Sequence, residues 1–328
     1  MTSKYVSKGF WNKKRVVVTG GAGFLGTKVV ERLITLGASE VFVPRSINYN
    51  LVNREDTIRL LKDAKPNIVI HLAAKVGGIW ANKLHPAEYF YENLMMGVQL
   101  FHSCWQEKIE KFVSVGTVCS YPKFATTPFS EDALWDGYPE ETNAPYGLAK
   151  KMLLVQSQTY RDQYGFNSIN LLPANLYGPG DNFDDTSSHV IPALIKKCVK
   201  ANNENLTDVE VWGTGSASRE FLFVDDAAKG IVAGAEFYNY SEPVNLGSGE
   251  EVTIKSLASK IAKSTRYEGN FVWDSSKPDG QPRRKLDTSR ALKKFGFQSE
   301  TKLSDGLKET AEWYIDSILQ DTNFSIRK

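Results

Sequence analysis

Short apolar runs alternate with longer stretches of helical periodicity through the first half of the chain. The apolar runs, rich in β-branched residues, are typical of buried strands; they fall at residues 15–19, 40–44, 67–72, 111–116 and 167–172. The helical stretches between them fall at residues 27–36, 86–107 and 146–164. This alternation predicts an α/β fold with a doubly wound parallel sheet. A binding cleft is expected at the carboxyl ends of its strands.

The pattern becomes irregular after about residue 180, where polar loops separate short elements. These elements fall at residues 190–199, 209–212, 252–263 and 270–273. We therefore expect a large domain over residues 1–180 and a smaller, mainly substrate-binding lobe over residues 181–328. The pattern near residues 220–248 also suits a return to the main sheet, so the two lobes are expected to be interleaved.

A glycine-rich turn connects the first predicted strand to the first helix. It consists of Gly20, Gly21, Ala22, Gly23, Phe24, Leu25 and Gly26. Glycines at this spacing allow a tight turn, close approach to a pyrophosphate and close packing of helix on strand. The helix N-terminus would direct its partial positive charge at the phosphates. This context favours a Rossmann-type dinucleotide site over a glycine turn that binds nothing.

The end of the second predicted strand indicates which dinucleotide binds. A site selective for NAD usually has an acidic residue there, whereas this chain has Arg45. A guanidinium suits the extra 2′-phosphate of NADP; a solvated surface charge is the alternative. Further cofactor contacts are expected at the ends of two other strands, from Leu72, Ala73, Ala74, Pro173, Asn175 and Leu176.

Composition narrows the class of protein. The chain has 328 residues, 24% of them charged, and a net charge of +2, which argues against a dedicated nucleic-acid surface. The cysteines Cys104, Cys119 and Cys198 show neither disulfide nor metal-ligand spacing, which favours a reducing compartment. Residues 1–14 are polar and basic, without the apolar segment of a signal peptide, and no apolar run has the length of a membrane span. These features predict a cytoplasmic protein without a bound metal.

Tyr146 and Lys150 have the spacing that places two side chains on one face of a helix. A phenol normally keeps its proton until about pH 10, and a neighbouring ammonium lowers its pKa. The pair would then exchange a proton near neutral pH. A packed tyrosine beside a solvated lysine is the plain alternative. Thr117 and Cys119, at a strand end, add polar groups to the same predicted cleft.

Several motifs in the right order resemble the extended short-chain dehydrogenase/reductase family over nearly the whole chain. They are the glycine turn, His71-Leu-Ala-Ala74, the Tyr146/Lys150 pair and Arg219-Glu-Phe-Leu-Phe-Val-Asp-Asp226. Narrower runs, such as Lys75-Val-Gly-Gly-Ile79 and Cys119-Ser-Tyr-Pro-Lys123, resemble family members that act on GDP-linked 4-keto-6-deoxy sugars. The resemblance implies NADPH as cofactor, epimerisation at C3 and C5 of the sugar, and hydride transfer to C4.

The resemblance also implies roles for individual residues. Tyr146 would protonate the C4 oxygen, with Thr117 hydrogen-bonded to the same atom and Lys150 holding the cofactor ribose. Cys119 and His189 would remove and return the protons on C3 and C5, and His189 would also contact the cofactor. Without the resemblance, Cys119 reads as a small core residue and His189 as a residue at the start of a helix. Thr117 replaces the family's usual serine, so the hydroxyl is kept but its rotamers are restricted.

The resemblance places the GDP-sugar against the smaller lobe, at Lys197, Trp212, Arg219 and Lys277. Arginine can bind a diphosphate bidentately, and tryptophan offers an apolar face to a base or a sugar. The alternatives are a solvated lysine, a core aromatic residue and an internal salt bridge. Family members commonly pair the helices at 86–107 and 146–164 in a four-helix interface, which implies a homodimer.

Two other functions are compatible with the sequence. One is a related nucleotide-sugar 4-reductase, epimerase or dehydratase that retains its NAD(P), although Arg45 speaks against NAD. The other is a cofactor-binding redox sensor without catalysis, which the intact Tyr146/Lys150 pair and Thr117 disfavour.

Overall fold

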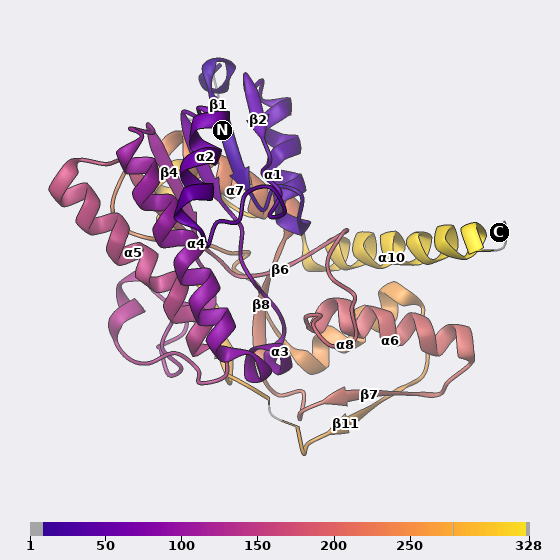
Figure 1. Cartoon of the computed structure of the whole chain (residues 1–328). Helices are drawn as coiled ribbons and strands as arrows, with labels where there is room; N and C mark the ends of the chain where they lie inside the picture. Colours follow the sequence, from indigo (N-terminus) through magenta and orange to yellow (C-terminus); the bar gives the residue numbers. More distant parts are fainter. Residues whose placement is uncertain (1–8, 278, 326–328) are drawn as a thin grey trace.

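The computed structural model describes residues 9–277 and 279–325. Residues 1–8 of the basic N-terminal segment and Pro278 lie outside the described part. Figure 1 shows a layered α/β body joined to a second group of elements, from which the C-terminal helix α10 (Leu303–Ser325) projects. In the part of the chain that the structure describes, no helix is both long and apolar enough to cross a membrane.

The main sheet has six parallel strands in the order β2-β1-β3-β4-β5-β9. They are β2 (Glu40–Phe42), β1 (Arg15–Thr19), β3 (Ile68–His71), β4 (Lys111–Val115), β5 (Ser168–Pro173) and β9 (Val244–Leu246). The central strands β3, β4 and β5 are buried along their whole length, which explains why they form largely apolar runs in the sequence. The predicted α/β, Rossmann-type sheet is confirmed.

Helices cover both faces of this sheet (Figure 1). On one face α1 (Phe24–Thr35) packs against α7 (Val224–Phe237); on the other, α4 (Pro86–Gln106) packs against α2 (Arg54–Ala64) and α5 (Ala144–Tyr164). Alternate residues of β1 belong to the two cores. Val16 and Val18 pack in the core that contains α1 and α7, while Val17 packs with α2 and α4.

The smaller lobe is built around strand β8 (Ser218–Phe223). This strand belongs to one sheet with β6 (Asn175–Tyr177), β10 (Glu251–Thr253) and β12 (Arg283–Arg284). A separate sheet joins β7 (Asp208–Trp212) to β11 (Asn270–Asp274). Helices α6 (Val190–Glu204), α8 (Ile254–Thr265) and α10 pack together beside these strands. The other α-helices in the described residues are α3 (Ile79–Leu84) and α9 (Ser289–Phe295).

Strand β6 lies in the segment 173–179, where the sequence pattern predicts no strand. Asn175, Leu176 and Tyr177 pair in parallel with residues 221–223 of β8. Three residues show no detectable periodicity, so the sequence pattern alone does not predict this strand. The strand forms because, in the folded smaller lobe, its backbone can pair with the edge of β8.

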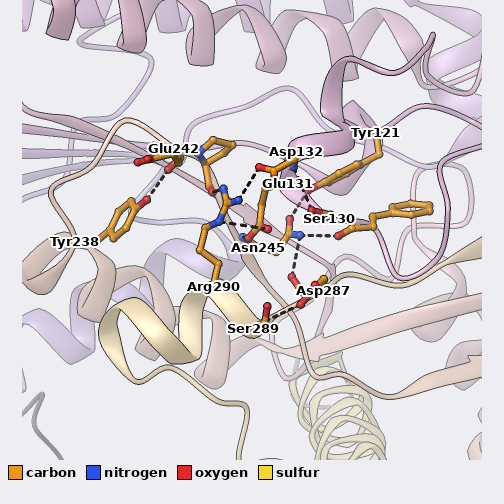
Figure 2. Close-up of polar contacts among 12 residues, drawn as sticks. Tyr121, Ser130, Glu131, Asp132, Tyr238, Glu242, Asn245, Asp287, Ser289 and Arg290 are labelled. Atoms are coloured by element: carbon orange, nitrogen blue, oxygen red, sulfur yellow. Dashed lines mark hydrogen bonds and ion pairs between the residues drawn. The ribbon is translucent and has the colours of Figure 1, made fainter.

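Asn245 in β9 ties the edge of the main sheet to segments that are distant in the sequence (Figure 2). Its backbone N–H donates to the carboxylate of Glu131 at 3.0 Å, and its side-chain oxygen accepts from the hydroxyl of Tyr121 at 2.7 Å. Its side-chain amide donates to the carbonyl oxygens of Phe129 (2.9 Å) and Asp287 (3.0 Å). Asn245 is fully buried, and every polar atom of its side chain is paired, as burial requires.

Candidate active site

The glycine turn brings the carboxyl end of β1 close to the N-terminus of α1. Gly20 has a left-handed backbone (φ +71°), and a Cβ there would lie 2.8 Å from the backbone nitrogen of Ala73. A Cβ on Gly26 would lie 2.6 Å from Cα of Gly21 and closer still to the carbonyl oxygen of Gly20. Only glycine permits this packing of helix against turn.

The rest of the turn leaves part of its backbone open. Residue by residue, Ala22 and Gly23 are exposed, Phe24 and Leu25 are half-buried, and Gly21 is buried. Exposed backbone at the head of a helix is suited to holding a pyrophosphate.

The segment after β3 runs beside the glycine turn. The backbone N–H of Leu72 donates to the carbonyl oxygen of Thr19 at 3.1 Å, and that of Ala73 lies 3.3 Å from the Thr19 hydroxyl, to which it donates. Ala74, the next residue, is half-buried. These three residues therefore lie at the sheet edge where the dinucleotide is expected.

The segment after β5 lies at the same edge of the sheet, but part of it serves the fold. Pro173 is the last residue of β5, and Leu176 lies in β6. The side-chain amide of Asn175 donates to the carbonyl oxygen of Glu220 at 2.9 Å. Asn175 therefore holds β6 against β8. This structural role was not predicted from the sequence, which indicated only a contact with the cofactor.

Arg45 follows β2 and is exposed. Its backbone carbonyl accepts from the N–H groups of Asn48 and Tyr49, both at 2.9 Å, so the chain turns here. Its guanidinium makes no hydrogen bond or ion pair with another described residue. An exposed guanidinium with its donors free fits an incoming phosphate.

Thr117, Cys119 and Tyr146 meet where β4 ends and α5 begins. The hydroxyl of Thr117 accepts the N–H of Cys119 at 3.1 Å and hydrogen-bonds with the phenol of Tyr146. The helix approaches this segment closely because Gly147 has no side chain: a Cβ there would lie 2.9 Å from the carbonyl carbon of Cys119. Lys150, on the next turn of α5, is buried.

Burial controls the ionisation of Tyr146 and Lys150. It raises the pKa of Tyr146; the neighbouring Cys119 raises it further, and the hydrogen bond with Thr117 lowers it. Burial also lowers the pKa of Lys150 to about 8. The prediction that the ammonium lowers the pKa of this phenol is therefore wrong, because desolvation of the phenol dominates. Tyr146 keeps its proton at neutral pH, which suits a proton donor.

Arg284, in β12, contacts Cys119, one of the two residues predicted to exchange protons with the substrate. Its Nη1 donates to Sγ of Cys119 at 3.6 Å. His189 precedes α6 as its N-cap residue and keeps an exposed surface. The protein around its imidazole lowers the pKa of His189 by desolvation, and Arg284 lowers it further.

The sequence pattern did not identify Arg284, which is 165 positions away from Cys119. The signal it does contain is the pair Arg283-Arg284 in a short strand, where successive side chains point to opposite sides. Arg283 is exposed and Arg284 is buried. Such a pair predicts that one of the two guanidinium groups points into the protein, but it does not predict that this group contacts Cys119.

Arg219, in β8, lies near Arg284. It donates to the backbone carbonyl oxygens of Ser218 (2.8 Å), Gln281 (2.5 Å) and Asp279 (3.1 Å). Burial lowers the pKa of Arg219 to about 10, and Arg284 contributes to the shift. Within residues 9–277 and 279–325, neither arginine forms an ion pair with a carboxylate. Two neighbouring guanidinium groups without carboxylate partners suit a diphosphate.

The three other residues predicted to bind substrate lie on the β7/β11 side of the lobe. Trp212 is 53% exposed and is therefore not a core aromatic residue. The ammonium of Lys277 lies 5.4 Å from the centroid of its ring, a cation–π geometry. Lys197 is exposed, and its ammonium donates to the carbonyl oxygen of Glu210 at 2.8 Å. No hydrogen bond among the described residues joins these three to Arg284.

Comparison with known proteins identifies the family. The chain matches the model of the "NAD dependent epimerase/dehydratase family" over residues 16–247. It is 40% identical to a "Probable GDP-L-fucose synthase 1" of Oryza sativa subsp. japonica over 93% of each chain. A GDP-6-OMe-4-keto-L-xylo-heptose reductase from C. jejuni superimposes with a TM-score of 0.88 at 28% identity, covering 94% of this chain and 100% of that chain. A GDP-L-fucose synthetase from Naegleria fowleri, solved with NADP, gives 0.83 at 28% identity, covering 92% and 94%. The chain therefore belongs to the NAD dependent epimerase/dehydratase family.

Proposed function

We propose that this protein is an NADPH-dependent epimerase-reductase that converts GDP-4-keto-6-deoxy-D-mannose to GDP-L-fucose. The observation that carries the proposal is the meeting of Thr117, Tyr146, Cys119 and Arg284 at the carboxyl edge of the main sheet. A phenol, a hydroxyl, a thiol and a cation in contact can move protons on and beside a ketone. The Oryza sativa relative, named "Probable GDP-L-fucose synthase 1", supports this substrate.

The residues at the sheet edge fit a dinucleotide. The glycine turn packs closely at Gly20 and Gly26 and leaves Ala22 and Gly23 exposed at the head of α1. The free guanidinium of Arg45 suits a 2′-phosphate, and Lys150 lies one helical turn from Tyr146, where a ribose would be held. When bound, the reduced nicotinamide supplies hydride to C4 of the sugar. The Naegleria fowleri relative solved with NADP supports NADP as the dinucleotide.

Epimerisation depends on the acidity that a 4-keto group gives to C3 and C5. Cys119 and His189 remove and return these protons, and the electron pair left on carbon is delocalised onto the C4 oxygen. Thr117 and Tyr146 donate hydrogen bonds to that oxygen. In the reduction, Tyr146 gives its proton to the same oxygen, because its raised pKa keeps the phenol protonated. The same two hydroxyls therefore serve both steps.

A 4-reductase that leaves C3 and C5 unchanged is the second candidate. The C. jejuni structure, described as a reductase of a GDP-linked 4-keto heptose, favours it. Both candidates use Tyr146 in the same way. They differ in whether Cys119 and His189 exchange protons with the sugar ring.

Incubation with GDP-4-keto-6-deoxymannose and NADPH in deuterated water separates the two candidates. We expect NADPH to be oxidised and the product to carry deuterium at both C3 and C5, as read by NMR. Oxidation without deuterium at either carbon would leave a simple reductase. Absence of oxidation would exclude this sugar, and the nucleotide released on denaturation would then show whether an NAD(P) is retained.

Replacement of Arg45 tests the choice of dinucleotide. Arg45→Ala should raise the KM for NADPH by about 10- to 100-fold, the cost of losing a charge-assisted hydrogen bond, and should change the KM for NADH little. Lys62→Ala, which removes an exposed charge from α2, is the control. An equal rise of the KM for NADPH and for NADH would show that Arg45 does not bind the 2′-phosphate.

We also propose that the protein forms a homodimer through α4 and α5 and works in the cytoplasm. Large apolar residues are exposed on these helices, namely Phe90, Tyr91, Val155 and Tyr164. Pairing of the two helices with those of a second copy would cover such a surface. The described cysteines are free, which suits a reducing compartment. Light scattering that gave the mass of a monomer would refute the dimer.

A further inference from the structure

The segment that carries Thr117 and Cys119 forms a single 3₁₀ turn, η2 (Val118–Ser120). The backbone N–H of Ser120 donates to the carbonyl oxygen of Thr117, and that of Cys119 donates to the Thr117 hydroxyl, both at 3.1 Å. A 3₁₀ turn is short and its hydrogen bonds are poorly aligned. The orientation of this turn therefore depends on the contacts that hold it from outside.

Ser120 joins the turn to the start of α5. It is 1% exposed, and its hydroxyl donates to the carbonyl oxygen of Gly147 at 2.9 Å. Gly147 directly follows Tyr146, so this bond connects the neighbour of Cys119 to the neighbour of Tyr146. The two segments are close here, because a Cβ on Gly147 would lie 2.9 Å from the carbonyl carbon of Cys119.

The next residue, Tyr121, holds the turn from another side. Its hydroxyl donates to Oδ1 of Asn245 at 2.7 Å (Figure 2), and both side chains are buried. Asn245 lies in β9, at the edge of the main sheet. The turn is therefore fixed to the sheet by Tyr121 and to α5 by Ser120.

The bonds between the turn and α5 act on different groups. Thr117 bonds directly with Tyr146, so the two hydroxyls that serve the C4 oxygen stay together without Ser120. In the part of the chain that the structure describes, no hydrogen bond joins Cys119 itself to α5. The position of Cys119 relative to Tyr146 therefore depends on the bond that Ser120 makes. Misplacement of a reacting group by about 1 Å can cost a factor of about 100 in rate.

We propose that Ser120 is a positioning residue that sets the place of the Cys119 side chain relative to Tyr146, and so allows proton exchange at the ring carbons and reduction at C4 to occur on one bound sugar. This inference rests on the proposed function. Ser120 does not touch the sugar, because its buried hydroxyl is taken up by Gly147. It acts through the backbone of the turn.

Ser120→Ala removes the hydroxyl and keeps a small buried side chain. With NADP⁺ in place of NADPH the ketone can exchange ring protons but cannot be reduced, so the exchange of deuterium at C3 and C5 and the oxidation of NADPH are measured separately. We expect exchange to slow about tenfold or more and reduction by less than about threefold, with the KM for the sugar unchanged. Ser120→Cys, whose thiol is a weaker donor, should lie between Ser120→Ala and the wild type.

Ser157 provides a matched control on the same helix. It is also fully buried, and its hydroxyl bonds with that of Ser168 in β5 at 2.7 Å, three turns of α5 away from Tyr146. Ser157→Ala should therefore destabilise the protein about as much as Ser120→Ala, but it should keep the ratio of exchange to reduction at the wild-type value. A Ser120 with a merely structural role would behave in the same way.

The hold of Ser120 on the turn can be measured without substrate, by hydrogen–deuterium exchange of backbone amides in the full-length protein. Ser120→Ala should speed amide exchange in peptides that cover residues 117–121 and 144–149 by about two- to tenfold, the usual weight of one hydrogen bond. Ser157→Ala should leave the peptide at 117–121 unchanged.

Two results with Ser120→Ala would overturn the proposal. One is backbone protection equal to that of the wild type, and the other is altered protection with the wild-type ratio of ring-proton exchange to reduction. A wild type that exchanges no ring protons would refute the proposed epimerisation and this inference with it. Because that result is read on the wild type alone, the two kinds of failure can be told apart.

Discussion

Tyr146→Phe is expected to slow reduction at C4 by about 10²- to 10⁴-fold, the usual contribution of a positioned proton donor. The phenylalanine keeps the ring in place beside the start of α5 but has no proton to give to the C4 oxygen. The hydrogen bond between Tyr146 and Thr117 is lost as well. Single-turnover oxidation of NADPH with the GDP-linked ketone measures the effect.

A second readout shows whether the loss belongs to proton donation alone. Deuterium exchange at C3 and C5 should persist in Tyr146→Phe, because Cys119 and His189 are unchanged, although loss of one donor to the C4 oxygen should slow it. Tyr138→Phe, which alters a phenol that is 63% exposed, is the matched control. Near-normal reduction by Tyr146→Phe would remove the phenol from the mechanism.

Gly26→Ala is expected to destabilise the protein by roughly 3 kcal/mol or more, beyond the usual cost of overpacking. Its Cβ would lie 2.6 Å from Cα of Gly21 and would overlap the carbonyl oxygen of Gly20. These are backbone atoms of a tight turn, so no side chain can rotate away to relieve the clash. Helix α1 would have to move away from β1, and NADP binding should weaken with it.

Gly23→Ala provides the control within the same turn. Its Cβ would meet only the carbonyl oxygen of Gly20, at 3.3 Å, and its backbone is extended, with φ near −89°. Urea unfolding should therefore show a loss of less than about 1 kcal/mol. Equal stability of the Gly26 and Gly23 variants would contradict the packing described for Gly26.

The main sheet could be predicted from the sequence because burial on both faces makes its strands apolar. The runs at β1, β3, β4 and β5 lie within one residue of the observed strand ends. Helix α1 begins at Phe24, three positions earlier than expected. Its first three residues belong to the glycine turn and contain no polar side chain, so they show no alternation of apolar and polar residues that would indicate a helix. Strand β6 was missed because its pairing with β8 exists only in the folded lobe.

Part of the candidate site could likewise be predicted from the sequence, and part of it could not. Residues in compact motifs, such as Gly20 and Tyr146, could be placed from local sequence. The contact of Arg284 with Cys119 joins segments that no local motif connects. The raised pKa of Tyr146 could not be predicted either, because it depends on the extent to which the folded protein excludes water from the phenol.

The place of β9 in the chain has a consequence for synthesis on the ribosome. This edge strand, Val244–Leu246, follows much of the smaller lobe in the sequence, and Asn245 also needs the carbonyl of Asp287. A nascent chain therefore cannot complete its large sheet until most of its length has emerged. Until then β5 presents an open edge, which is a template for pairing with other unfinished chains. Chaperones that bind the nascent chain are therefore expected to matter most between the synthesis of β5 and the pairing of β9 with it.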